Sequence, residues 1–251
     1  MELIGSGWKP ISMVDVYNTV TFTIWLCGCN LKCPFCHNWR LAETKKDVCH
    51  LLDINLLIEE IDSAKSLIDY IHVTGGEPLL QWKNLVVLFK YLKQQYNYKV
   101  SINTNMTLYK PLEKMIKEEI VDHVATDLKY PPQLLYGLPK EITDILWKQF
   151  LKSLRLVADH FIPLELRIPI PKNIDYNSLI LTINSIAKIL EKTNFYIIIN
   201  PLLGPPITTP RNIKWCKTYC DPDKELMIML QEKIKELGIE KVYVRDNLHF
   251  G

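Results

Sequence analysis

Three cysteines close together near the N-terminus are the residues of this sequence best suited to chemistry. Cys29 is followed by three residues before Cys33, and two more separate Cys33 from Cys36. Thiolates crowded on one loop are typical ligands of zinc and of iron–sulfur clusters. Structural zinc sites usually take four protein ligands, whereas three thiolates leave one iron of a four-iron cluster open. The count therefore favours a [4Fe–4S] cluster, and an open iron indicates catalysis.

Zinc remains an alternative for these cysteines. In that case His37 or Cys27 would supply the fourth ligand, and the loop would belong to an interaction module without catalysis. We expect Cys27 to lie outside the site, because alternation from Cys29 places it on a strand end, where a buried free thiol is the commoner role.

The other cysteines carry less information. Cys216 and Cys220 lie in a proline-rich region and could form a second metal site with Cys49 and His50, but no clear ligand spacing supports one. We therefore expect structural thiols there. Seven cysteines without an export signal favour reduced thiols and metal over disulfides.

Further polar and glycine-containing motifs follow the predicted strands. The carboxyl ends of parallel strands meet at one rim, where α/β folds build their active sites, so these motifs are expected to converge. Such convergence of independent motifs indicates an enzyme. The motifs are Gly75-Gly76-Glu77-Pro78, Thr104-Asn105, Asp127-Leu128-Lys129 and Arg167.

Each motif also has a purely structural explanation. Gly75-Gly76 alone predicts only a turn. Asp127 and Lys129 could form an exposed pair at a strand end. Arg167 follows Glu165 within an apolar strand and could belong to a buried ion pair. These alternatives stay open from the sequence alone.

The elements that must position these residues alternate along the chain. Alternating strands and helices imply parallel pairing with helical crossovers. About six units favour an α/β fold of the partial (β/α)6 barrel type over a closed eight-unit barrel. The expected strands are 20–26, 70–74, 99–103, 123–126, 164–170, 195–199 and 241–245, and the expected helices are 51–68, 83–96, 111–119, a segment within 142–160, 178–191 and 224–237.

Nothing in the sequence divides the chain. We expect a single domain over residues 1–251, with a cluster loop at 27–38 and a C-terminal extension at about 203–251. An apolar content of 48% supports a large core, and a net charge of +2 argues against nucleic acid or an anionic membrane as partner. No signal peptide or membrane-spanning apolar run is found, so a cytoplasmic protein is expected.

These motifs carry a family resemblance. Cys29-x3-Cys33-x2-Cys36, with Phe35 before the last cysteine, resembles the signature of the radical S-adenosylmethionine (SAM) superfamily, and Gly75-Gly76-Glu77-Pro78 resembles its second motif. The stretch 33–38, the lead-in 7–16 and Asp127-Leu128-Lys129 are similar to the activating enzymes of glycyl radical enzymes, which act on pyruvate formate-lyase and anaerobic ribonucleotide reductase.

The resemblance implies cofactors, partners and contacts. The cofactors would be a [4Fe–4S] cluster on the three cysteines and SAM, which is cleaved reductively to a 5′-deoxyadenosyl radical. The partners would be a glycyl radical enzyme, such as anaerobic ribonucleoside-triphosphate reductase, and a low-potential electron donor such as ferredoxin or flavodoxin. The positions in contact with SAM would be Phe35, His37, Gly76, Asp127, Leu128 and Lys129, with Asn105 and Arg167 matched less closely.

The chemistry of SAM suggests a role for several of these residues. Gly75-Gly76 lets the backbone approach a ligand closely. Glu77 could support the ammonium group of the methionine moiety, either directly or through the turn. Lys129 and Arg167 suit its carboxylate or the ribose.

Two departures from the activase pattern leave the substrate open. Asn200-Pro201-Leu202 stands where a late-strand histidine of the pyruvate formate-lyase activases reaches the adenosyl group, and Asn105-Met106 replaces a common Asn-Gly. SAM cleavage is compatible with both differences. Direct action on a small molecule, a nucleoside or a tRNA base is therefore the alternative to activation of a partner enzyme.

Overall fold

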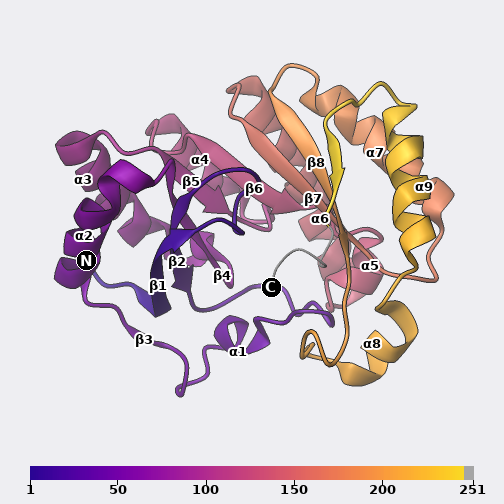
Figure 1. Ribbon diagram of the computed structural model, residues 1–251, viewed down its shortest axis with the longest axis horizontal. Coiled ribbons are helices and arrows are strands. Elements are labelled where there is room, and N and C mark those ends of the chain that lie inside the picture. The colour runs from indigo at the N-terminus through magenta and orange to yellow at the C-terminus, as the bar shows by residue number, and fades with distance from the viewer. Residues whose placement is uncertain (246–251) are drawn as a thin grey trace.

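One curved sheet organises the protein, as a computed structural model that describes residues 1–245 shows (Figure 1). Its strands are β1 (Ile4–Ser12), β2 (Thr21–Leu26), β3 (His50–Leu51), β4 (Tyr70–Gly75), β5 (Val100–Asn103), β6 (His123–Asp127), β7 (Leu164–Ile170), β8 (Phe195–Pro201) and β9 (Val242–Val244). Within residues 1–245 they form one nine-stranded sheet of order β3-β1-β2-β4-β5-β6-β7-β8-β9. Neighbours from β2 through β4 to β9 pair in parallel, whereas β1 is antiparallel to β2 and β3.

Helices connect the strands, and most of them cover the outside of the sheet. They are α1 (Trp39–Ala42), α2 (Ile54–Ala64), α3 (Trp82–Tyr96), α4 (Tyr109–Lys117), α5 (Pro132–Leu135), α6 (Lys140–Asp159), α7 (Tyr176–Leu190), α8 (Ile213–Tyr219) and α9 (Lys224–Lys235), with short 3-10 helices at Lys65–Leu67 and Pro78–Gln81. The predicted α/β fold of the partial (β/α)6 barrel type is confirmed. None of the helices in the described residues is both long and apolar enough to cross a membrane.

Sequence patterns miss the antiparallel strand β1. The strand contains Gly5, Gly7 and Pro10, residue types that disfavour strands. Its register with β2 shifts between Gly5 and Gly7 and again between Lys9 and Ser12, so the strand is bulged. Pairing with β2, rather than local propensity, therefore forms β1.

The predicted helix 51–68 also begins later than expected. Asp53 caps α2, because its side chain accepts hydrogen bonds from the backbone N–H groups of Asn55 and Leu56 at 3.0 and 3.2 Å. The preceding residues His50–Leu51 pair with β1 instead. The cap residue Asp53 therefore determines where the helix begins, whereas apolar periodicity placed this start too early.

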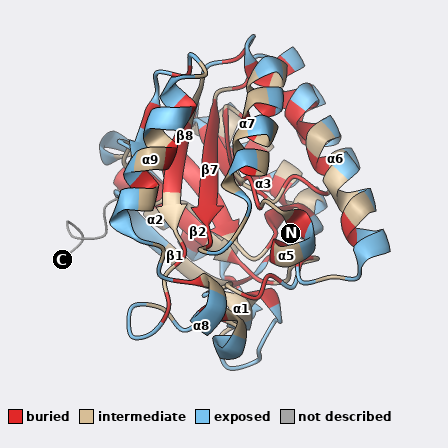
Figure 2. Ribbon diagram, turned by 90° about the vertical axis from the view of Figure 1, so that its right-hand side faces the viewer, coloured by how far each residue is buried: buried red, intermediate tan, exposed pale blue. Residues whose placement is uncertain are grey.

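Side-chain alternation along the strands separates an apolar outer face from a polar interior. On β7, Leu164, Leu166 and Ile168 are buried in the main hydrophobic core, whereas Glu165 and Arg167 between them bind other polar groups. Figure 2 shows the buried strands in red, with helices that expose only their outer surfaces. On β7 the outer face is therefore apolar, and the side chains of the opposite face carry polar groups into the interior.

Two histidines share a serine inside the barrel. The Oγ atom of Ser101 lies 2.9 Å from Nδ1 of His72 and 2.8 Å from Nδ1 of His123. Burial, reinforced by Arg167, places the pKa of His72 well below 6.5. Burial also lowers the pKa of His123 to about 4, although Glu165 opposes this effect. Both imidazoles are therefore neutral near pH 7.

Acid should destabilise the protein through these histidines. The unfolded chain takes up their protons as the pH falls through about 6.5, whereas the folded protein keeps His123 neutral down to about pH 4. The contribution of the neutral histidines to the free energy of unfolding is therefore fully present above this window. It is lost as the pH falls through the window, by about 3 kcal/mol for His123. Urea unfolding of the apoprotein at about pH 7.5 and about pH 5 should show the loss. A His123→Gln variant with unchanged pH dependence would contradict this assignment.

Candidate active site

A single cavity at the carboxyl ends of the strands brings most of the predicted site residues together. It has a volume of about 530 Å³ and is lined by the ends of β2 and of β4 to β8 together with the cluster loop. In Figure 2 the strands point toward this end of the molecule, where α1 and α8 lie. The predicted site residues on the cavity wall are Cys29, Cys33, Phe35, Cys36, His37, Gly75, Gly76, Asn105, Asp127, Lys129 and Arg167.

The three cysteines of the cluster loop carry the free thiols. Among residues 1–245, Cys29, Cys33 and Cys36 are the cysteines outside disulfides. Burial raises the pKa of Cys29 to about 11 and that of Cys33 to about 12. Burial also raises the pKa of Cys36, where the positive charge of Arg211 opposes it. Thiols with such raised pKa values release their protons when a metal replaces them.

These thiols fit an iron–sulfur cluster better than a single metal ion. Within the described part of the chain, no group of three or more Cys, His, Asp or Glu side chains is arranged to hold one ion. In a cubane cluster each thiolate binds a different iron, so the ligands lie farther apart than around one ion. Three free thiols on one cavity wall, with no fourth ligand gathered among them, meet that requirement.

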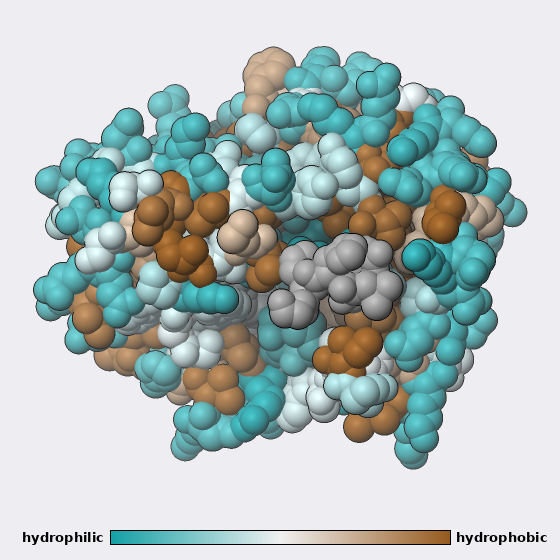
Figure 3. Space-filling model, viewed as in Figure 1, coloured by the Kyte–Doolittle hydropathy of each residue, from teal (hydrophilic) through white to brown (hydrophobic). Residues whose placement is uncertain are grey.

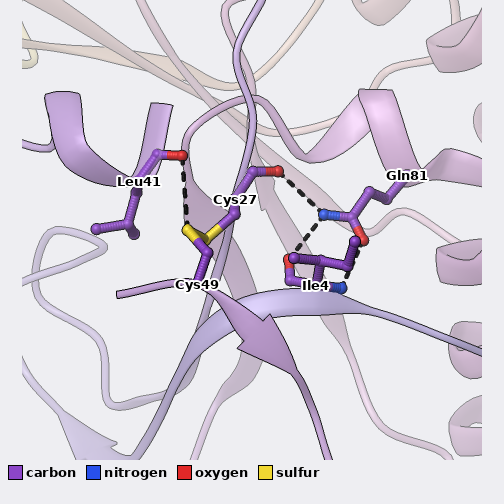
Figure 4. The surroundings of a disulfide bond; sticks show 5 residues. All are labelled: Ile4, Cys27, Leu41, Cys49 and Gln81. Carbon is purple, nitrogen blue, oxygen red and sulfur yellow. Dashed lines mark hydrogen bonds between the residues drawn. A yellow bond between two sulfur atoms is a disulfide. The ribbon is translucent and has the colours of Figure 1, made fainter. Parts of the chain in front are cut away.

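A disulfide at the start of the cluster loop contradicts the expectation of reduced thiols. Cys27 is bonded to Cys49, so Cys27 is not a free thiol and Cys49 is not available to a second metal. Figure 4 shows that the bond ties the loop to the segment after α1, where Cys49 Sγ lies 3.9 Å from the carbonyl oxygen of Leu41. The carbonyl of Cys27 also accepts a hydrogen bond from Gln81 Nε2 at 3.1 Å. Local sequence does not predict this disulfide, because the two cysteines meet only when residues 38–49 fold back onto the end of β2.

A second disulfide joins Cys216 and Cys220 across one turn at α8, so the expectation of two thiols is wrong here as well. A metal site built on them is excluded in this state, because neither sulfur is free. Both sulfurs lie in a small core with Leu135 and Leu202, and Phe35 packs against that core. The pair therefore supports the cluster loop from behind.

Gly75-Gly76 brings the end of β4 into backbone contact with the cluster loop. Gly75 has a φ of +113°, and a Cβ on Gly76 would lie 2.0 Å from the carbonyl oxygen of Gly28. The N–H of Gly76 donates to the carbonyl of Leu26 at 2.8 Å, and the N–H of Glu77 donates to that of Gly28 at 2.7 Å. The motif is therefore a required point of close approach and not only a turn.

The Glu77 side chain lies behind the cavity wall. It is fully buried, and its Oε1 accepts hydrogen bonds from the Leu79 N–H at 3.0 Å and the Thr104 hydroxyl at 2.7 Å. Its Oε2 accepts one from the Asn105 N–H at 2.6 Å. The Glu77 carboxylate therefore fixes two turns of the rim, and Glu77 is not among the residues that line the cavity.

Leu128 is the other predicted contact whose side chain is not on the wall. It is fully buried in the main hydrophobic core. Its N–H donates to the carbonyl of Arg167 at 2.7 Å. Leu128 thus separates its charged neighbours Asp127 and Lys129 in sequence while its own side chain points away from the cavity.

Asp127, Lys129 and Arg167 form one charged group on the wall. Asp127 Oδ2 lies 2.9 Å from Lys129 Nζ, and its Oδ1 lies 3.0 Å from Arg167 Nε. Arg167 also donates to the side-chain oxygen of Asn103, whose Nδ2 donates to Thr74 Oγ1 at 2.8 Å. Burial raises the pKa of Asp127, but the two cations outweigh burial and hold that pKa below its usual range. The exposed pair considered for Asp127 and Lys129 is therefore wrong, whereas Arg167 does form a buried ion pair, on the cavity wall.

The remaining predicted residues complete the wall. Phe35 lines the cavity and packs against the small core around Leu135. It also packs against a second small core, formed by Leu31, Cys33 and Tyr136. Burial lowers the pKa of His37, although Asp127 opposes this effect. Asn105 donates from Nδ2 to Asn30 Oδ1 at 2.8 Å and so connects the β5 turn to the cluster loop.

Sequence reasoning missed residues that hold the cluster loop or other parts of the cavity wall in place. The N–H of Lys32 donates to the carbonyl of Tyr136 at 3.0 Å, and a Cβ on Gly137 would lie 2.0 Å from the carbonyl oxygen of Lys32. Arg245 lines the cavity and donates from Nη2 to the carbonyl of Val14 at 2.7 Å. These contacts join segments that are distant in sequence. The pair Tyr136-Gly137 was therefore the only local signal in the sequence for any of them.

A partial barrel with three free thiols beside a charged, buried cavity defines an enzyme that binds an iron–sulfur cluster together with a polar cofactor. The family model described as the Radical SAM superfamily matches residues 23–186. The chain belongs to this superfamily, and its cofactors are a [4Fe–4S] cluster and SAM. Membership leaves no support for a zinc-binding interaction module without catalysis.

Individual relatives agree with this assignment. The chain is 27% identical over 253 residues, 99% of its length and 95% of the relative's, to a Methanocaldococcus jannaschii protein named, provisionally, as a glycyl-radical enzyme activating enzyme. It is 34% identical over 130 residues, 45% of its length and 51% of the relative's, to the 7-carboxy-7-deazaguanine synthase of Rickettsia prowazekii. A radical SAM methyltransferase structure from Sphaerobacter thermophilus shares the fold, with a TM-score of 0.66, 15% identity and coverage of 94% of this chain and 68% of that one.

Proposed function

We propose that the protein is the activating enzyme of a glycyl radical enzyme, such as an anaerobic ribonucleoside-triphosphate reductase. The similarity over nearly the whole chain to the M. jannaschii relative carries this proposal. The 5′-deoxyadenosyl radical would take the Cα hydrogen of a glycine in the partner. The C–H bond breaks homolytically, the hydrogen ends on 5′-deoxyadenosine, and the unpaired electron stays on the glycine. A low-potential ferredoxin or flavodoxin would supply the electron that the cluster passes to SAM.

The residues on the cavity wall would divide this work. Each of the three free thiols would bind one iron and leave the fourth iron to SAM. Lys129 and Arg167 would face the carboxylate of the methionine moiety, since both cations are fixed on the wall by Asp127. The other proposed SAM contacts are Phe35, His37, Gly75, Gly76 and Asn105.

Apolar side chains at the mouth of the cavity support a protein substrate. Val14 and Ile207 line the cavity, yet they are 46% and 66% exposed, and the neighbouring Met13 is 71% exposed. The face seen in Figure 3 carries hydrophobic areas, in brown, among hydrophilic ones. Exposed apolar groups at a rim favour contact with a polypeptide loop over contact with a charged nucleotide.

Anaerobic reconstitution with iron and sulfide tests the proposal. With SAM, a chemical reductant and a glycyl radical enzyme encoded in the same genome, we expect 5′-deoxyadenosine and a glycyl radical signal in the electron paramagnetic resonance (EPR) spectrum. A partner variant with alanine at the radical glycine is the control and should show no signal. Production of 5′-deoxyadenosine without a radical in any such partner would overturn the activase proposal and leave SAM cleavage intact.

Direct action on a small molecule, a nucleoside or a tRNA base is the second candidate. The similarity to the R. prowazekii 7-carboxy-7-deazaguanine synthase over about half of that protein favours it. In this case a low-molecular-weight or RNA substrate, without any protein partner, would stimulate 5′-deoxyadenosine formation. Assays that add nucleoside, purine-like and tRNA pools to the reconstituted protein separate the two candidates.

A further inference from the structure

The chain segment just before α8 binds the backbone of the cluster loop. The N–H of Arg211 donates to the carbonyl of Cys36 at 3.0 Å, and the N–H of Asn212 donates to that of Pro34 at 2.9 Å. The Arg211 side chain adds a third bond, from Nη1 to the carbonyl of Cys33 at 3.3 Å. In both views α1 and α8 lie at the same end of the molecule (Figures 1 and 2). The segment therefore fixes the part of the loop that carries two of the three free thiols.

The Arg211 guanidinium also forms an ion pair across the loop. Its Nε lies 3.2 Å from Oε1 of Glu43, the residue that follows α1. The Arg211 side chain is only 15% exposed, whereas the Glu43 side chain is 39% exposed and also lies near Lys45 Nζ. A largely buried cation is thus held between the loop and a partly solvated carboxylate.

A fixed cation at this place changes the relative energies of the oxidised and reduced states of a bound cluster. Reduction adds a negative charge to the cluster, and a nearby cation stabilises the reduced state more than the oxidised one. The effect is stronger for a side chain shielded from water, as Arg211 is. Glu43 lies beyond Arg211 and opposes the effect of its charge.

We propose that Arg211 is a positioning residue for the cluster loop whose charge raises the reduction potential of the cluster, and that Glu43 limits this rise. The proposal rests on membership of the radical SAM superfamily and not on the identity of the substrate. It assigns one pair of residues two separable effects: the geometry of the loop and the potential of the cluster.

Spectroelectrochemical titration of the reconstituted protein, followed by EPR, tests the charge effect. Arg211→Met should lower the reduction potential, because it removes the cation, and Glu43→Gln should raise it, because it leaves the cation uncompensated. Opposite shifts support the proposal. Shifts in the same direction, or no shift in Glu43→Gln, would overturn it. Glu118→Gln is the matched control, since Glu118 pairs with Lys90 Nζ at 2.6 Å on the surface, and it should leave the potential unchanged.

Arg211→Lys separates position from charge. Lysine keeps the cation but lacks the planar fork that reaches Cys33 and Glu43 at once. We expect a potential near that of the natural protein, together with faster loss of iron to a chelator. A potential lowered as far as in Arg211→Met would show that the charge is not the cause and would overturn the assignment. If Arg211→Met fails to retain a cluster, Glu43→Gln and Arg211→Lys still decide the question.

Discussion

Replacement of Cys33 by alanine should abolish both iron binding and SAM cleavage. Cys33 is the least exposed of the three free thiols, at 7% of its surface, so water cannot easily take the place of its sulfur. The loss of one thiolate leaves two ligands for a cluster that already has one open iron. Iron content after anaerobic reconstitution and 5′-deoxyadenosine formation should both fall to background, while the apoprotein unfolds in urea much as before.

A double replacement, Cys216→Ala with Cys220→Ala, is the matched control. It removes two sulfurs that are buried and bonded to each other behind the cluster loop. The variant should lose stability, because its small core shrinks, and keep its iron. Full iron content in Cys33→Ala, or loss of iron in the control alone, would show that the proposed thiols do not bind the cluster.

The parallel strands could be predicted because each has a local signature. The predicted strand 164–170 coincides with β7, whose apolar side chains alternate with Glu165 and Arg167. The antiparallel strand β1 could not be predicted, because Gly5, Gly7 and Pro10 disfavour a strand and only its pairing with β2 forms one. Local patterns therefore identified the centre of the sheet and missed its antiparallel edge.

The same distinction applies to the site. The rule that the ends of parallel strands meet at one rim predicted that Asp127 and Arg167 lie close together. In the structure, Oδ1 of Asp127 lies 3.0 Å from Nε of Arg167. No local rule pairs Cys27 with Cys49 or brings Arg211 to Cys33, which lies 178 positions earlier in the chain. Residue type and strand position predict which groups line a cavity, whereas the residues that hold a loop in place come from contacts between distant segments.

Replacement of Gly76 by alanine should destabilise the protein and disrupt the cluster loop. The new Cβ would lie 2.0 Å from the carbonyl oxygen and 2.8 Å from the carbonyl carbon of Gly28, so backbone and not a flexible side chain would have to move. The displaced backbone also carries the 2.7 Å hydrogen bond from the N–H of Glu77 to Gly28. We expect a loss of about 2–4 kcal/mol in the free energy of unfolding, measured by urea denaturation of the apoprotein.

Gly238→Ala isolates the steric effect from backbone strain. Gly238 has a φ of +84° but no atom within 4 Å of an added Cβ, so alanine there brings strain without a clash. It should lower the free energy of unfolding by only about 1 kcal/mol and leave cluster and SAM binding unchanged. Gly76→Ala should in addition weaken SAM binding and iron retention, because Gly28 leads directly into Cys29. Equal effects of the two substitutions would mean that the close approach of β4 to the cluster loop does not hold the site together.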